Sequence, residues 1–218
     1  MANLLEATLQ QYPRPYLTDI ELATLLDGTP DSRYGKVKRL LAQGKMVHIR
    51  KGLYCLTNTI GYLKKPHPYE LAQYIYGPSY ISMESALSFH KLIPETVYTI
   101  TSVTNKRAKE FKTPLGIFSY LHLPIKNFYT GVKLIKESGS QFFIATPWKA
   151  ICDYIFCYKK NWNNPEPLIE SLRINYEDLP LLSNEEIKLL DDYYLHSRIN
   201  RFLKSIQKRN VYVLKDRT

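Results

Sequence analysis

The stretch GKMVHIRKGLYCLT (residues 44–57) decides how the first part of the chain folds. On either side of the triplet Arg50-Lys51-Gly52, short runs alternate in the manner of β-strands. We therefore expect two strands, residues 45–49 and 53–57, joined by a tight turn at the glycine. Charged turns of this kind occur on ordinary hairpins and on hairpins that hold a polyanion. The neighbouring segments must distinguish the two.

Three predicted helices precede this hairpin. Residues 3–11 form a short helix that ends before Pro13, and residues 19–26 form a second one with Thr18 as its N-cap. The third helix covers residues 31–43. This order of helix, helix, helix and hairpin is typical of a winged helix-turn-helix domain, in which the third helix enters the major groove of DNA.

The third predicted helix has an apolar face and a basic face. Residues at helical spacing are expected to face the core, namely Tyr34, Val37, Leu40 and Leu41. The opposite face then presents Ser32, Gly35, Lys36 and Arg39, with Lys38 at its edge. Arg33 and Arg39 are expected to contact bases, because a guanidinium can bind guanine through two hydrogen bonds. Lys36 and Lys38 are expected to contact phosphates.

The formal net charge of +10 is concentrated near these elements. Between residues 30 and 51, one acid, Asp31, stands against a series of basic side chains, whereas residues 161–218 hold acids and bases in equal number. Such a local excess predicts a polyanionic partner, with nucleic acid the first candidate, although a basic bias can also serve solubility. Arg50 and Lys51 would lie on the flanking DNA backbone or in the minor groove. The predicted DNA-binding residues are Ser32, Arg33, Gly35, Lys36, Lys38, Arg39, Lys45, Arg50 and Lys51.

The rest of the chain predicts a fold of the α+β class with three parts. Residues 1–62 form the DNA-binding domain, residues 63–160 an α+β domain with a mostly antiparallel sheet, and residues 161–218 a helical C-terminal subdomain. In the second part we expect helices at 70–76, 83–92 and 147–158, and strands at 97–103, 117–123, 132–135 and 141–145. In the third part, Ser183 and Glu186 form a capping box, and an apolar stripe follows at Leu195, Ile199, Phe202, Leu203 and Ile206.

Most enzyme classes find no support in the sequence. The three cysteines and five histidines are scattered, so neither a disulfide framework nor a metal site is predicted, and no nucleotide-binding or hydrolase motif is present. We therefore expect a protein without catalytic residues or cofactors. No signal peptide or membrane span is predicted, which favours the cytoplasm.

Two weaker patterns leave alternatives open. Glu95, followed by Glu110 and Lys112, is loosely similar to the acids and lysine of metal-dependent nucleases, in which carboxylates hold a cation. Asp153 lies among apolar residues on a predicted helix, where an acid is either catalytic or, more often, paired locally. A winged helix can also be a protein-interaction module that neutralises a partner directly.

Several blocks of the chain together resemble the AbiEi antitoxin family. They are the RKGLY of the opening stretch, SYISMESALSFHKLIPE (79–95), TSVTNKRAKEFKTPLGIFSY (101–120) and IATPWKAICDY (144–154). The resemblance covers roughly residues 15 to 158, and the family has glutamate where Trp148 stands.

This resemblance implies a bacterial regulator encoded beside a nucleotidyltransferase-like toxin in a type IV toxin–antitoxin system. Such a protein uses its winged helix to bind inverted repeats at its own promoter, as an autorepressor. The resemblance also implies that the C-terminal domain counters the toxin without forming a stable complex with it. Repressors on inverted repeats usually bind as pairs, but the sequence leaves open whether two copies of this chain meet on DNA.

Overall fold

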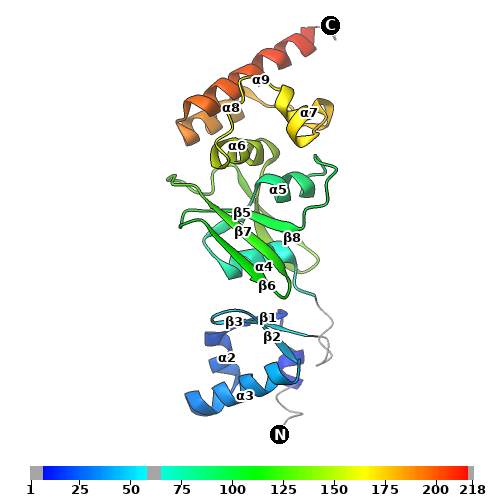
Figure 1. The fold of residues 1–218 in the computed structure, drawn as a ribbon. Helices are drawn as coiled ribbons and strands as arrows, with labels where there is room; N and C mark the ends of the chain where they lie inside the picture. The colour runs from blue at the N-terminus through cyan, green and yellow to red at the C-terminus, as the bar shows by residue number, and fades with distance from the viewer. Residues whose placement is uncertain (1–6, 58–64, 216–218) are drawn as a thin grey trace.

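The computed structural model describes residues 7–57 and 65–215. Within these ranges the protein has mixed α and β structure in three groups of elements that follow one another along the long axis of the molecule (Figure 1). The N-terminal group lies at one end, a six-stranded sheet with its helices lies in the middle, and the C-terminal helices lie at the other end. The predicted domain boundary at residues 62 and 63 lies outside the described residues.

The N-terminal group combines two capped helices with a small antiparallel sheet. Its elements are β1 (Tyr16–Thr18), α2 (Asp19–Leu25), α3 (Pro30–Ala42), β2 (Met46–Arg50) and β3 (Leu53–Leu56), and the strand order is β1-β3-β2. Thr18 caps α2 and Thr29 caps α3, so the second and third predicted helices and the hairpin are confirmed. Of the first predicted helix, residues 7–10 are helical, and residues 3–6 lie outside the described ranges.

The prediction for Tyr34 is wrong. Val37 and Leu40 are buried as expected, in a core with residues of α2 and the hairpin, but the side chain of Tyr34 is 71% exposed. Arg33 and Lys36 are half-buried instead, so the inner face of α3 includes these two side chains. Long basic side chains can cover apolar surface with their methylene stems. They can therefore occupy inward-facing positions that a search for apolar residues alone does not identify.

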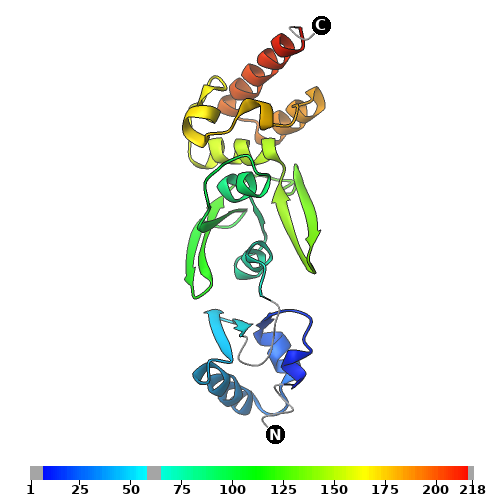
Figure 2. The same ribbon diagram turned by 90° about the vertical axis from the view of Figure 1, so that its right-hand side faces the viewer.

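The central domain is built on a mixed sheet of strand order β6-β7-β5-β4-β9-β8. The pairs β4–β5, β6–β7 and β8–β9 are antiparallel, whereas β4–β9 and β5–β7 are parallel. Figure 2 shows the two outer hairpins diverging on either side of α4. The elements are α4 (Pro68–Ile75), β4 (Ser79–Ile81), α5 (Met83–Phe89), β5 (Thr99–Thr104), β6 (Lys109–Thr113), β7 (Gly116–His122), β8 (Val132–Glu137), β9 (Ser140–Ala145) and α6 (Pro147–Cys157).

The C-terminal helices share their core with the central domain. They are α7 (Glu166–Leu172), a short 3-10 turn (Tyr176–Asp178), α8 (Asn184–Tyr194) and α9 (Ser197–Lys215). One continuous cluster of buried side chains includes residues from Leu71 to Ile206, together with Tyr16, Ile49, Leu53 and Cys55 of the N-terminal group, so residue 160 does not separate two cores. The prediction that Leu195 joins the apolar stripe is wrong. Leu195 ends α8 in a left-handed conformation and is 85% exposed, because the chain turns there before α9 begins.

Candidate nucleic-acid interface

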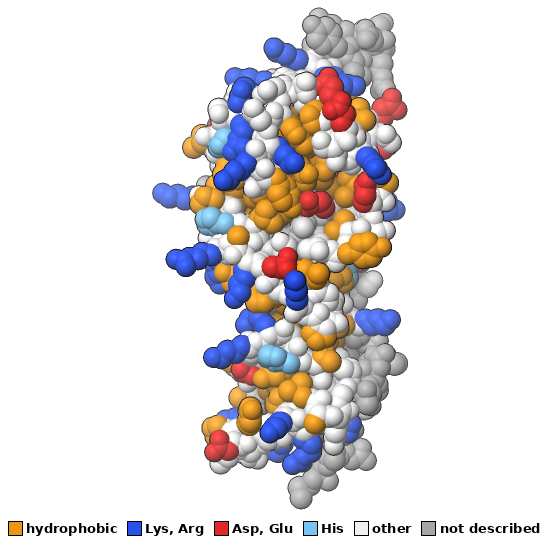
Figure 3. Space-filling model, in the orientation of Figure 1, with side chains coloured by type: hydrophobic (Ala, Val, Ile, Leu, Met, Phe, Trp, Pro, Cys, Tyr) orange, Lys and Arg blue, Asp and Glu red, His pale blue; other side chains and the backbone are white. Residues whose placement is uncertain are grey.

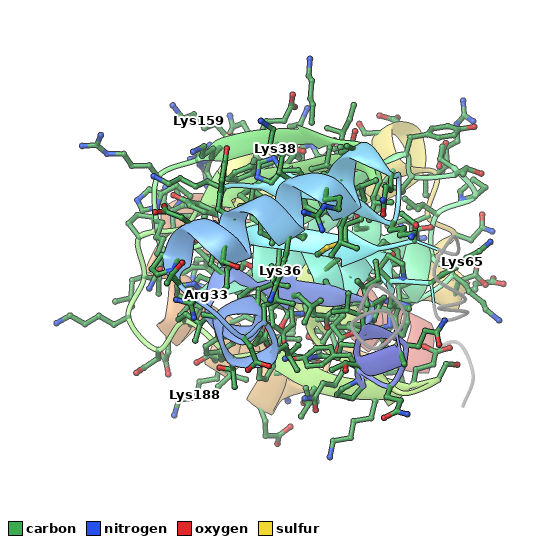
Figure 4. All side chains as sticks on the ribbon, turned by 90° about the horizontal axis from the view of Figure 1, so that it is seen from below. Arg33, Lys36, Lys38, Lys65, Lys159 and Lys188 are labelled. Carbon is green, nitrogen blue, oxygen red and sulfur yellow. The ribbon has the colours of Figure 1, made fainter. Side chains whose placement is uncertain are left out.

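The outward face of α3 is an exposed basic surface of the N-terminal group. Ser32, Gly35, Lys38 and Arg39 are all exposed, as predicted from the helical phase. Within the described residues, the charged groups of Lys38 and Arg39 form neither a hydrogen bond nor an ion pair with the protein. The view from below shows α3 in front of the rest of the molecule (Figure 4). The face is therefore open to a large partner.

The side chains of Arg33 and Lys36, which we expected to contact DNA, hydrogen-bond inside the N-terminal group. The Arg33 guanidinium donates to the Ala23 carbonyl at 3.0 Å, and the Lys36 ammonium donates to the Asp27 carbonyl at 2.6 Å. Both carbonyls lie at the end of α2 or just after it, where helices leave carbonyls unpaired and favour cations. In Figure 4, Arg33 and Lys36 lie on one side of α3 and Lys38 on the other. Arg33 and Lys36 thus hold α3 against α2.

The hairpin turn faces the central domain, and the side chain of Arg50, which we expected to contact DNA, hydrogen-bonds there. Its guanidinium donates to the Tyr74 carbonyl of α4 at 3.2 Å and to the neighbouring Lys51 carbonyl at 2.8 Å. Strand β2 also contacts β6 of the central sheet. Lys51 stays exposed at the turn, and Lys45 is half-buried at the start of the hairpin. The charge at position 50 therefore stabilises a contact between domains.

A second arginine strengthens this contact. The Arg14 guanidinium hydrogen-bonds the Tyr74 hydroxyl of α4 and pairs with Glu21 of α2. Partial burial opposes ionisation of Glu21, but hydrogen bonds, first of all from Thr18, outweigh this effect and lower its pKa. The ring of Tyr16 packs on that of Tyr74 with centroids 4.5 Å apart. Residues far apart in sequence thus hold the N-terminal group on α4.

Tyr34 is the residue at this interface that sequence reasoning missed. Its ring stands exposed on α3, one turn before Lys38, so it adds an aromatic surface to the outward face. Its apolar spacing with Val37 and Leu41 gave the opposite prediction. Four residues on one helix face cover a wide arc. Packing against the rest of the domain decides which of the residues at the edges of this arc reaches the core.

The acids of the nuclease alternative line one cavity, but their surroundings do not suit a metal. Glu95 and Glu110 border a cavity of about 480 Å³ between α5, the sheet and α7. Glu95 pairs with Arg173 at 3.2 Å, and Glu110 lies 4.0 Å from the Lys112 ammonium. Across residues 7–57 and 65–215, no cluster of three or more His, Cys, Asp or Glu has a geometry that could hold a cation. These contacts are those of ordinary ion pairs.

Asp153 belongs to a fully buried polar network. Its carboxylate accepts hydrogen bonds from Lys149 at 2.6 Å and Tyr194 at 2.6 Å, and also from Tyr80 at 3.0 Å and Ser82 at 2.7 Å. Lys149 and Asp153 both have no exposed side-chain surface. Burial lowers the pKa of the Lys149 ammonium. The network connects α6 with β4 and α8, so Asp153 is paired as a structural acid.

The chain matches no model of a known protein family, and no curated protein matches it either. No helix in the described part of the chain combines the length and the apolar character that a membrane span requires. The resemblance to the AbiEi family therefore stays a prediction, which rests on the sequence blocks quoted above.

Proposed function

We propose that this protein is a DNA-binding transcriptional autorepressor whose N-terminal group is a winged helix-turn-helix domain. In this proposal α3 is the helix that enters the major groove. The observation that carries it is the outward face of α3, which presents unpaired basic groups on a rigid, capped helix. Rigid helices that carry unpaired cations suit a DNA groove, because cations that neutralise phosphates release the counterions condensed on the DNA.

We propose separate roles for the residues of α3, because these residues differ in their contacts with the rest of the N-terminal group. Arg39 is the candidate for a base contact, since its fork of donors is free, and Lys38 is the candidate for a phosphate contact. Gly35 has open space around the position of a missing Cβ, so no neighbour in the protein requires glycine there. Glycine in a helix interior costs about 1 kcal/mol, and close approach of a DNA backbone would explain why it is present.

The antitoxin part of the proposal comes from the AbiEi resemblance. We propose that the protein represses its own promoter at inverted repeats, with two copies on the DNA. The central domain and the C-terminal helices would counter a nucleotidyltransferase-like toxin without a stable complex. Growth of cells that express the neighbouring toxin gene would be restored by the full chain. A chain with intact DNA binding that fails to restore growth would refute the antitoxin role alone.

DNA binding is tested by footprinting on the region upstream of the gene. The wild-type protein should protect inverted repeats there. The Arg39→Ala variant should bind them more weakly by about 1–3 kcal/mol and lose preference at one base position. Arg201→Ala, which removes an exposed arginine of α9, is the matched control and should bind like the wild type. Absence of protection by the wild-type protein at moderate salt would refute the proposal.

A further inference from the structure

The cavity of about 480 Å³ between α5, the sheet and α7 has no role in the proposed DNA binding. Glu84 of α5 borders it together with Glu95 and Glu110, and we call it the carboxylate cavity. On the face drawn in Figure 3, acidic side chains lie among hydrophobic ones over the central part of the molecule. Its volume is in the range of cavities that bind small organic molecules.

A polar row across three strands forms the floor of the carboxylate cavity. Thr101 of β5 lies opposite Ser119 of β7, and Ser119 lies opposite Glu110 of β6. Residues paired in this way lie on the same face of the sheet, in strands about 5 Å apart. The Thr101 hydroxyl donates to the Ser82 carbonyl at 2.8 Å, whereas the Ser119 hydroxyl has no hydrogen-bond partner in the described part of the protein. The floor therefore offers an unused hydroxyl beside a carboxylate.

Glu84 is a half-buried carboxylate that pairs with no cation of the described residues. It accepts a hydrogen bond from the Tyr158 hydroxyl at 3.4 Å. Burial, and after it the charge of Glu84, raises the pKa of Tyr158, so this hydroxyl stays protonated. Glu95 and Glu110 pair with exposed cations at 3.2 Å and 4.0 Å, and exposed pairs are weak. The cavity thus favours a cationic ligand, with Glu84 as its first anchor.

Two tyrosine rings give the carboxylate cavity an aromatic wall. The rings of Tyr154 and Tyr158 meet edge to face with centroids 4.7 Å apart. The Lys160 ammonium lies 5.7 Å from the centre of the Tyr154 ring, so this wall already attracts a cation of the protein itself. Apolar side chains complete the lining, namely Ile93, Val97 and Leu172. Such a wall suits a cation that is carried on a hydrocarbon chain.

The placement of the carboxylates distinguishes between classes of cation. They come from α5, from the segment that follows it and from β6. In the described ranges, no three acids, histidines or cysteines are close enough together to hold one metal ion. An elongated polyamine carries its ammonium groups several bonds apart, so it can reach carboxylates that cannot share a single ion. Anionic ligands are disfavoured, because they would bring a further negative charge to this lining.

We propose that the carboxylate cavity binds an aliphatic polyamine. One ammonium group pairs with Glu84, a second one lies between Glu110 and the Ser119 hydroxyl, and the hydrocarbon chain between them lies along the ring of Tyr154. The ligand would contact the central domain and α7 at once, so its binding stabilises the contact between them. This proposal goes beyond DNA binding by α3 and does not depend on it.

The test is isothermal titration calorimetry of the full chain with spermidine. The wild type should bind one equivalent, and its melting temperature should rise with the spermidine concentration. The test variant is Glu84→Gln, which removes the charge and keeps the shape of the side chain. The matched control is Glu137→Gln, which removes an exposed acid of β8 at the opposite edge of the sheet from β6. Thermal unfolding without ligand establishes that both variants are folded.

The Glu84→Gln variant should bind spermidine about tenfold or more weakly than the wild type, and the control should bind like the wild type. If Glu84→Gln does not fold, Ser119→Leu takes its place, because a larger side chain on the floor should also abolish binding. Wild-type affinity in the folded test variant would refute the proposal.

Two further probes exclude less specific explanations. Magnesium chloride at matched ionic strength should neither bind in the titration nor reproduce the rise in melting temperature. An equal effect of magnesium would assign the result to general charge screening and refute the proposal. Octanediol, a neutral chain of similar length, should not bind, and binding as tight as that of spermidine would refute the role of the carboxylates. Loss of DNA binding in a wild-type protein that still binds spermidine would refute the proposed function alone.

Discussion

Replacement of Asp153 by leucine should lower the free energy of unfolding at neutral pH. Part of this lost stability should return at alkaline pH. The carboxylate of Asp153 is fully buried and is the anionic partner of the Lys149 ammonium at 2.6 Å. Without this carboxylate, the hydrogen-bond partners left to the ammonium are the hydroxyl groups of Tyr80 at 2.7 Å and Tyr194 at 2.9 Å. Removal of one member of a buried ion pair costs about 3–5 kcal/mol, because the remaining charge is left in a medium that solvates it poorly.

The direction of the pH effect follows from the pKa of Lys149. Burial already lowers this pKa, and Asp153 is the main group that opposes the effect. In the variant the folded pKa falls further below the unfolded value of about 10.4. Between these two values the unfolded chain binds a proton that the folded chain does not, so the free energy of unfolding increases with pH. The gain is up to about 1.4 kcal/mol for each pH unit in that window.

The measurement is thermal and urea unfolding followed by tryptophan fluorescence, since Trp148 and Trp162 are both buried near this core. At pH near 7 we expect the Asp153→Leu variant to melt about 6–20 °C below the wild type, at about 2–4 °C per kcal/mol. The deficit should shrink as pH rises toward about 9. Asp192→Leu, at an exposed acid of α8, is the control and should change little. A deficit that stays constant or grows with pH would refute the assignment of the network as a buried ion pair.

Three further substitutions test single features of the fold. Leu195→Gly should raise the free energy of unfolding by about 1 kcal/mol in urea titrations, because Leu195 is exposed and has a left-handed backbone that glycine adopts without strain; an unchanged or lower value would contradict this. Arg50→Ala should lower it by about 1–2 kcal/mol through loss of the bond to the Tyr74 carbonyl, and should leave the salt dependence of DNA binding unchanged. A smaller salt slope would return Arg50 to the DNA-contacting set. Thr29→Ala should cost about 1 kcal/mol by removing the N-cap of α3, whereas Thr24→Ala on the exposed side of α2 should cost less.

Local signals in the sequence predicted α2, α3 and the hairpin, because caps and glycines act within a few residues. Thr29 and Pro30 begin α3, and Gly44 follows its end. Strands β4 and β6 were missed for different reasons. Residues Ser79–Ile81 are too short to show alternation, and Lys109–Thr113 resembles a solvated loop because three of its five residues are charged. Each is recognisable only from its neighbours in the sheet.

The roles of the cations could be predicted only in part, for a related reason. A helical wheel separates inner from outer positions, and it correctly placed Lys38 and Arg39 outside. It cannot show that Lys36 reaches the Asp27 carbonyl, since that bond depends on how α2 and α3 cross. Nor can it show that the turn at Arg50 meets α4, which lies beyond it in sequence. A tertiary contact can occupy a cation that would otherwise be available to DNA, and the net charge of +10 does not reveal this. A basic segment in a sequence therefore sets an upper limit on the number of phosphate contacts, and the contacts within the protein decide which of its members remain available.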